Sequence, residues 1–123
     1  MAQLSMPPRP YSPFRWAGSQ LYIAGLVAID RERNVVVGST VAEQTAYIVD
    51  LLEGILGRNG LGLADLVANR VFLTSIADID QVDAVYRDRF PEPYPVRTTI
   101  GIGVLARPEL LVEIDGIACR AEP

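Results

Sequence analysis

Apolar residues recur three and four positions apart between residues 40 and 60, the spacing of one face of a helix. The recurring positions are Ile48, Leu51, Leu52, Ile55 and Leu56. Thr40 and Glu43 stand just before this run, where a hydroxyl and a carboxylate satisfy free backbone amides of a first helical turn. Gly57, Asn59 and Gly60 then supply a stop. We therefore predict an amphipathic helix that begins at 40–43 and ends near 57–60.

A second helical pattern follows closer to the C-terminus. Its apolar positions are Ile79, Val82, Val85, Tyr86 and Phe90. Asp78 precedes the pattern and offers a second N-terminal cap. The prolines at 91, 93 and 95 cannot continue a helix, so we expect about three turns that end at this cluster. Residues 63–66 predict one further helical turn.

Runs rich in β-branched and aromatic residues, bounded by turn residues, predict the strands. Gly18-Ser19 suits a tight hairpin between the first two runs, and the charged residues 30–34 form a turn before the third. The predicted strands are residues 14–17, 20–26 with a continuation towards Ile29, 35–37, 67–75, 96–103 and 110–118.

The element order is thus β-β-(β)-α-β-α-β-β, which favours a two-layer α/β (α+β) sandwich with two helices on one face of a mixed sheet. Residues 1–123 fit a single domain. Residues 1–13 hold four of the nine prolines and no periodicity, so we expect an extended arm there. The uncovered sheet face and the sheet edges are natural places for subunits to meet.

Composition narrows the possible partners. The formal net charge of -4 opposes binding to phosphate backbones, so we expect no nucleic-acid partner. No run of eighteen apolar residues occurs, and prolines stand where a signal peptide needs an apolar stretch, so we expect a cytoplasmic protein without a membrane partner. The lone Cys119 fits a reducing compartment, although many exported bacterial proteins share that feature.

The chain contains no histidine, which removes Ser-His-Asp and Cys-His machinery and the usual zinc triads. No phosphate-binding glycine motif occurs either, so we expect neither a metal nor a cofactor. Alternation places Arg97 and Thr99 on one side of their strand, and Glu113 and Asp115 on one side of another. If both strands lie in one sheet, Arg97, Glu113 and Asp115 can form a charged cluster, either as a structural ion pair or as a site.

Several segments resemble the RidA/YjgF family, in order along nearly the whole chain. They are PYSPF-x₆-LYIAG, VAEQT, VFLT, VYRDRFP and PVRTTIGIG followed by LLVEIDGIA. The last pair is the most diagnostic. The resemblance implies a chorismate-mutase-like, YjgF-type fold and a homotrimer with sites in clefts between subunits.

In such a site, the resemblance assigns Arg97 to the carboxylate of an imino or enamino acid and Glu113 to the attacking water. The products would be a keto acid and ammonia. Tyr11 matches a tyrosine packed beneath the ligand, with a buried aromatic as the alternative, and Gly25 matches a glycine whose amide faces the ligand, with close strand packing as the alternative.

Departures from the family pattern fall at the positions that tune the site. Ala24 and Leu26 stand where relatives often carry serine and glutamine, Thr99 where many carry cysteine, and Asp83 where they carry asparagine. These changes indicate a different or bulkier substrate, or reduced deaminase activity. Tyr94 is a further candidate for the lining of a cleft, whereas Trp16, Tyr22 and Cys119 are more typical of packing.

Three functions therefore remain open. The first is a deaminase of small 2-imino or enamino carboxylates, and the second is a non-catalytic trimer that binds a small carboxylate or regulates through it. The third is an aminomuconate-type deaminase, whose dicarboxylate substrate needs a second cation, with Arg9, Arg15 and Arg107 as candidates. Some relatives are described as ribonucleases, but the acidic balance and the missing histidine oppose that activity here.

Overall fold

The computed structural model describes residues 9–121, and the predicted helices and strands all form there. The strands are β1 (Phe14–Ala17), β2 (Gln20–Val27), β3 (Ile29–Asp30), β4 (Val35–Val36), β5 (Leu66–Leu73), β6 (Val96–Gly101) and β7 (Val112–Cys119). The helices are α1 (Val41–Arg58) and α2 (Ile79–Arg89), with short 3₁₀ turns at Leu63–Asp65 and Ile76–Asp78.

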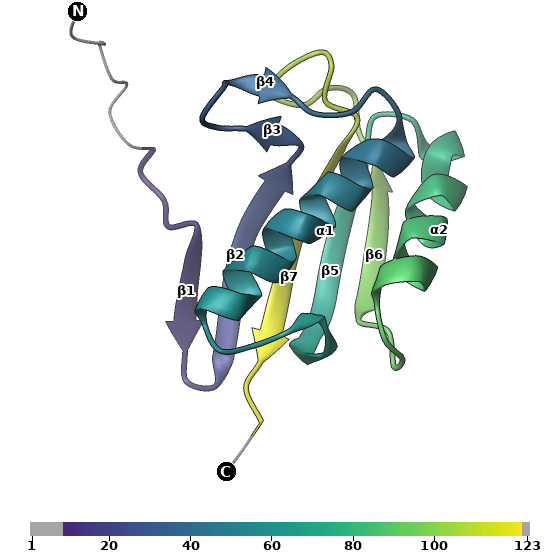
Figure 1. Cartoon of the computed structure of the whole chain (residues 1–123). Helices are drawn as coiled ribbons and strands as arrows, with labels where there is room; N and C mark the ends of the chain where they lie inside the picture. The colour runs from purple at the N-terminus through teal and green to yellow at the C-terminus, as the bar shows by residue number, and fades with distance from the viewer. Residues whose placement is uncertain (1–8, 122–123) are drawn as a thin grey trace, which may run out of the picture.

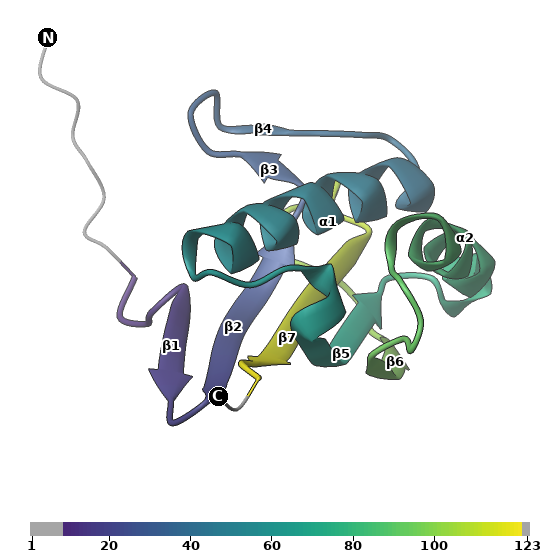
Figure 2. The ribbon, with the colours of Figure 1, turned by 60° about the horizontal axis from the view of Figure 1, so that its bottom comes forward.

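Five strands form one sheet in the order β1-β2-β7-β5-β6, while β3 and β4 pair separately. All neighbours in the large sheet are antiparallel except β5 and β6, which are parallel. Both helices lie on the same face of this sheet (Figure 1), and the view along the layers shows that no helix of residues 9–121 lies on the opposite face (Figure 2). The two-layer sandwich predicted from the sequence is confirmed. We call the face without helices the open face.

The core lies between the helices and the covered face of the sheet. Every second residue of the central strands points into the core. These side chains pack against helix residues that recur every three to four positions. The buried strand residues on this face include Leu21, Ile23, Val71, Leu73, Val112, Ile114 and Ala118. Their helical partners include Ile48, Val49, Leu52, Leu56, Val82 and Tyr86.

The first helix begins as the sequence predicts. Glu43 N donates to Thr40 Oγ1 at 3.1 Å, and Glu43 Oε1 accepts from the backbone amides of Ser39 at 2.9 Å and Thr40 at 3.2 Å. These hydrogen bonds, above all the one from the Ser39 amide, lower the pKa of Glu43. The helix start is therefore fixed by its own sequence.

The prediction that the Asp78 side chain caps the second helix is wrong. The helix does begin after Asp78, but the Asp78 side chain caps no backbone amide. Its Oδ1 accepts instead from Gln81 Nε2 at 3.3 Å, and Gln81 Oε1 accepts from Ala42 N at 3.0 Å. This link fixes α2 against the first turn of α1. Strand ends also differ from prediction by one to two residues, because β6 stops at Gly101 and β7 starts at Val112.

Gln44 is fully buried and joins α1 to the chain that enters β7. Its Nε2 donates to the carbonyls of Gly38 at 3.1 Å and Glu109 at 2.8 Å, and its Oε1 accepts from Leu111 N at 2.9 Å. A buried amide with all these partners satisfied is directional, unlike an apolar contact. It therefore sets the position at which β7 begins, one residue before Glu113.

We predict that Gln44→Leu lowers the free energy of unfolding by about 1–3 kcal/mol, because two carbonyls and one amide lose their buried partner. The measurement is urea denaturation of wild type and variant. Gln20→Leu, at an exposed position, serves as control and should change stability by less than about 0.5 kcal/mol. Equal midpoints for Gln44→Leu and wild type would contradict the structural role of this amide.

Candidate functional site

Arg97 leaves the edge strand β6 on the covered side of the sheet and meets α2 there. Its Nη2 pairs with Asp83 Oδ1, and its Nε donates to Thr99 Oγ1 at 3.1 Å. The guanidinium carbon also lies 4.9 Å from the centroid of the Tyr86 ring. Only 19% of the Arg97 side chain is exposed. The arginine is thus held in one orientation by three neighbours.

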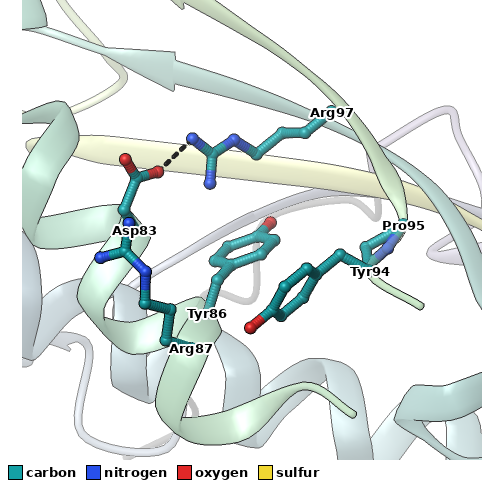
Figure 3. A pocket seen from close by; sticks show the side chains of 6 residues that line it. All are labelled: Asp83, Tyr86, Arg87, Tyr94, Pro95 and Arg97. Atoms are coloured by element: carbon teal, nitrogen blue, oxygen red, sulfur yellow. Dashed lines mark hydrogen bonds and ion pairs between the residues drawn. The ribbon is translucent and has the colours of Figure 1, made fainter. Parts of the chain in front are cut away.

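A pocket opens beside this arginine, between α2 and the proline-rich segment before β6 (Figure 3). Its volume is about 360 Å³, which is enough for a small carboxylic acid. The lining residues are Asp83, Tyr86, Arg87, Tyr94, Pro95 and Arg97. Two guanidinium groups, one carboxylate and two phenol rings therefore surround the space, and we call it the arginine pocket.

The floor of the arginine pocket is tied to the sheet by buried hydrogen bonds. Tyr86 Oη donates to Asn69 Oδ1 at 2.9 Å, and Asn69 Nδ2 donates to the Asp115 carbonyl at 2.7 Å. Both Tyr86 and Asn69 are almost fully buried. Burial raises the pKa of the Tyr86 phenol, so it stays protonated and keeps donating. This chain of contacts connects α2, β5 and β7.

The predicted cluster of Arg97, Glu113 and Asp115 does not form within one chain. β6 and β7 belong to one sheet, but β5 lies between them. Arg97 pairs in register with Asn69 on the covered face, whereas Glu113 and Asp115 pair with Phe72 and Arg70 on the open face. Alternation predicts which residues of one strand share a face. It does not predict whether residues of two different strands lie on the same face, because that depends on the register between the strands.

Asp115 instead forms an ion pair on the open face. Arg70 Nη2 lies 2.6 Å from Asp115 Oδ2, and the Arg70 backbone amide donates to Oδ1 at 2.9 Å. The hydrogen bond that the Arg70 guanidinium donates to Asp115 raises the pKa of Arg70. The sequence allowed a structural ion pair between an arginine and a carboxylate of β7. Such a pair does form at Asp115, but its arginine is Arg70 and not Arg97.

Glu113 lies against a bulge in β2. The register between β2 and β7 shifts between Ile23 and Leu26, so Ala24 and Gly25 bend out of the regular ladder. A Cβ on Gly25 would approach Glu113 Cδ to 2.8 Å, so a larger residue there would displace the carboxylate from its present position. Partial burial, and then the charge of Asp115, raise the pKa of Glu113.

The other predicted open-face residues gather near this bulge. Tyr11, Ala24 and Gly25 line one shallow depression together with Arg15. Tyr11 is 63% exposed, so it is not the buried aromatic of the alternative interpretation. The seven predicted site residues thus fall into two groups, one at the arginine pocket and one on the open face. The first group is Arg97, Asp83 and Thr99, and the second is Glu113, Gly25, Ala24 and Tyr11.

The remaining candidates are distributed as follows. Tyr94 lines the arginine pocket, as the sequence suggested. Arg107 Nη1 donates to the carbonyl of Asn34 at 3.2 Å. The side chains that line the arginine pocket do not include Arg9, Arg15 or Arg107. The cation that does line it is Arg87, which the sequence analysis missed. Its position one helical turn after Asp83 was the available signal.

Of the three residues expected to pack, Trp16 and Cys119 are half-buried, whereas Tyr22 is 45% exposed on the open face, so that expectation is wrong for Tyr22. Trp16 Nε1 donates to Asn59 Oδ1 at 3.0 Å, and Cys119 is a half-buried free thiol at the end of β7. Within residues 9–121, no group of three or more acidic, cysteine or histidine side chains is arranged to hold a metal ion. In the same range, no helix is long and apolar enough to cross a membrane.

An arginine pocket at the edge of a helix-covered mixed sheet, with a carboxylate set against a strand bulge on the other face, defines a class of small α/β proteins. A family model described as Endoribonuclease L-PSP matches residues 3–120. The chain belongs to this family, whose members also carry the names RidA, YjgF and RutC.

Curated relatives and solved structures agree with this assignment. A 3-aminoacrylate deaminase RutC from Acinetobacter baylyi is 33% identical over 112 residues, which cover 91% of this chain and 88% of the relative. A YjgF/YER057c/UK114 family protein from Mycobacterium tuberculosis is 30% identical with a TM-score of 0.79, over 89% and 86% of the two chains. RidA from an Antarctic Psychrobacter is 25% identical with a TM-score of 0.84, over 97% and 92%.

We predict that Tyr86→Phe lowers the free energy of unfolding by about 1–3 kcal/mol, because Asn69 Oδ1 is left buried without its donor. Chemical denaturation measures the change. Tyr47→Phe is the matched control, since the Tyr47 side chain is half-buried on α1 and its hydroxyl bonds to nothing within residues 9–121. A loss of equal size in both variants would show that the bond to Asn69 has no special role.

A pH dependence follows from the raised pKa of Glu113. The folded protein holds this proton more tightly than the unfolded chain, so the stabilising effect exists at low pH and disappears as pH rises through the folded pKa. Glu113→Gln should therefore raise the melting temperature near pH 7, with a gain that vanishes towards about pH 4. Thermal unfolding across this range is the measurement. Glu32→Gln, on an exposed turn, should give no such trend.

Proposed function

We propose that this protein is a hydrolytic deaminase of small 2-imino or enamino carboxylates. The observation that carries the proposal is the half-buried Arg97 in a pocket of about 360 Å³, with Glu113 retained beside Gly25. The 33% identical relative named as a 3-aminoacrylate deaminase supports the same chemistry.

Arg97 would bind the substrate carboxylate. Its Nε and Nη2 already donate to Thr99 and Asp83, so Nη1 and the second Nη2 hydrogen form the edge that remains for a ligand. That edge is planar and suits two oxygens at once, which a lysine ammonium would not. Binding there fixes the imine carbon in one place.

Glu113 would direct the attacking water. A carboxylate whose pKa is raised by burial is a better general base near neutral pH than an exposed one. In the reaction, water adds to the imine carbon, the carbon–nitrogen bond breaks, and a keto acid and ammonia leave. An enamine first takes a proton on carbon to become the imine.

A site that uses both residues requires two copies of the chain, because Arg97 and Glu113 project from opposite faces of one sheet. We propose a homotrimer in which the arginine pocket of one copy meets the bulge of the next. The open face supports this arrangement, since it carries exposed apolar side chains and no helix within residues 9–121 covers it. These include Tyr22 and Val96, of which Val96 is 71% exposed.

A non-catalytic protein that binds a small carboxylate is the second candidate. The apolar side chains of Ala24 and Leu26 favour this candidate, because neither can form a hydrogen bond with a water or a substrate. An aminomuconate-type activity has weaker support, since Arg9, Arg15 and Arg107 do not line the arginine pocket. The net charge of -4 opposes a ribonuclease activity of the kind that the family model is named for.

The test is hydrolysis of imines produced in place by an amino-acid oxidase, with semicarbazide trapping what remains. We expect wild type to accelerate keto acid formation from small imines and Arg97→Ala to lose at least about 100-fold, because a charge-assisted bidentate contact is removed. The panel includes acidic and aromatic imines. No acceleration with any of them, together with binding of a small carboxylate, would favour the second candidate.

Mixing two inactive variants tests the shared site. Arg97→Ala and Glu113→Gln, denatured together and refolded in equal amounts, should recover about a quarter of wild-type activity, because one interface in four pairs an intact arginine with an intact glutamate. Each variant refolded alone is the control. Light scattering should show a trimer, and a stable monomer at micromolar concentration would remove the model.

A further inference from the structure

Two carboxylates and one arginine share a small area of the open face. Glu113 and Asp115 are separated by one residue on β7, so their side chains project from the same side of the strand. Across the ladder, Asp115 lies opposite Arg70 of β5, and Glu113 lies opposite Phe72. Residues that are diagonal across such a pair of strands are about 7–8 Å apart, within reach of a long side chain. Arg70 can therefore reach either carboxylate.

In the structure, Arg70 binds Asp115 and not Glu113. Its Nη2 and Nε lie 2.6 and 2.7 Å from Asp115 Oδ2, and its backbone amide donates to Oδ1 at 2.9 Å. The guanidinium carbon also lies 5.6 Å from the centroid of the Phe72 ring. Within residues 9–121, the Glu113 carboxylate forms no ion pair and accepts no hydrogen bond. Of the two carboxylates, one is therefore fully engaged and the other is free.

The charged and titratable groups around Glu113 come from several parts of the chain. Besides Asp115 and Arg70, the depression that Gly25 lines holds Tyr11, Arg15 and Tyr22. Under the proposed function, on which this inference rests, another copy adds Arg97 with its partner Asp83. Burial, and then the negative charge of Asp115, raise the pKa of Glu113. Asp115 thus acts on Glu113 even though Arg70 is bound to it.

A carboxylate that directs water must keep its oxygens available to that water. A guanidinium bound to Glu113 would occupy those oxygens and compete with the water for them. We propose that Asp115 is a positioning residue, which binds Arg70 and thereby keeps the guanidinium away from Glu113. The Glu113 carboxylate then stays free to hold a water. Asp115 and Arg70 touch no substrate in this role and act only through Glu113.

The first test measures the pKa of Glu113 by NMR titration of its carboxyl carbon in the intact protein, with no substrate present. In Asp115→Asn we expect this pKa to fall by at least about 1 pH unit, because a negative neighbour is lost and Arg70 can turn to Glu113. The asparagine oxygen can still accept from the Arg70 amide, so this contact between the strands is kept. Arg70→Gln breaks the pair from the other side and should raise the pKa of Glu113, since Asp115 loses its counter-charge.

A double variant separates the lost negative charge from the released arginine. With Asp115→Asn and Arg70→Gln together, no arginine can turn to Glu113, so its pKa should fall by clearly less than in Asp115→Asn alone. The matched control is Asp50→Asn, which breaks an ion pair of similar length, 2.9 Å to Arg89, between the two helices. It should leave the pKa of Glu113 unchanged.

The pH profile of kcat/KM for imine hydrolysis is the second test. In Asp115→Asn the acidic limb should move to lower pH with the pKa of Glu113, while the rate on the plateau falls at least about ten-fold, because Arg70 now engages the glutamate. Adding Arg70→Gln should restore most of that rate. A merely structural loss would not be rescued by removing a second side chain.

Three results would each overturn the proposal. They are an unchanged pKa of Glu113 in Asp115→Asn, an equal fall in the single and double variants, and an unchanged or lowered pKa in Arg70→Gln. Because the titration needs no substrate, it is separate from the deaminase assay. The expected titration without imine hydrolysis by wild type would remove the proposed function and keep the contact role of Asp115. Hydrolysis with an unchanged titration would do the reverse.

Discussion

The hydrogen bond from Tyr86 to Asn69 is the contact on which the geometry of the arginine pocket depends. It crosses from α2 to β5 inside an apolar core, where an unpaired hydroxyl or amide would be costly, so few relative positions of helix and sheet are acceptable. The Tyr86 ring lies beneath the guanidinium of Arg97, while Asp83 and Arg87 stand on neighbouring turns of the same helix. One buried contact therefore positions the floor, the cation and the flanking charges together.

The sheet imposes a second constraint, because it keeps Arg97 and Glu113 on opposite faces. Arg97 and Glu113 are separated by an intervening strand and by the thickness of the backbone, so no rotamer brings them together in one chain. Under the proposed function, a site that uses both residues would therefore form where the open face of one copy meets the arginine pocket of another. The bulge at Ala24 and Gly25 leaves the space that the Glu113 carboxylate occupies, because a side chain at residue 25 would meet it there.

Periodicity and capping were sufficient to predict the elements, since these depend on neighbours within a few residues. The capping box at Thr40 and the alternation in β7 are of this kind. The relation between β6 and β7 was not predictable, because it depends on the register of β5, which lies between them and far away in sequence. The role of Arg87 was missed for the same reason. A surface arginine becomes part of a pocket only when the segment around Tyr94 packs opposite it.

Gln44 has a consequence for how this protein tolerates change. The segment 102–109 runs from the end of β6 to the residue whose carbonyl Gln44 binds, and Val104 within it is 81% exposed. Because the buried amide fixes both Glu109 and Leu111, the strand that carries Glu113 begins at a point set by α1 rather than by the loop. The loop is thereby mechanically isolated from the open face, and lengthening or shortening it can reshape the outer surface while β7 keeps its register.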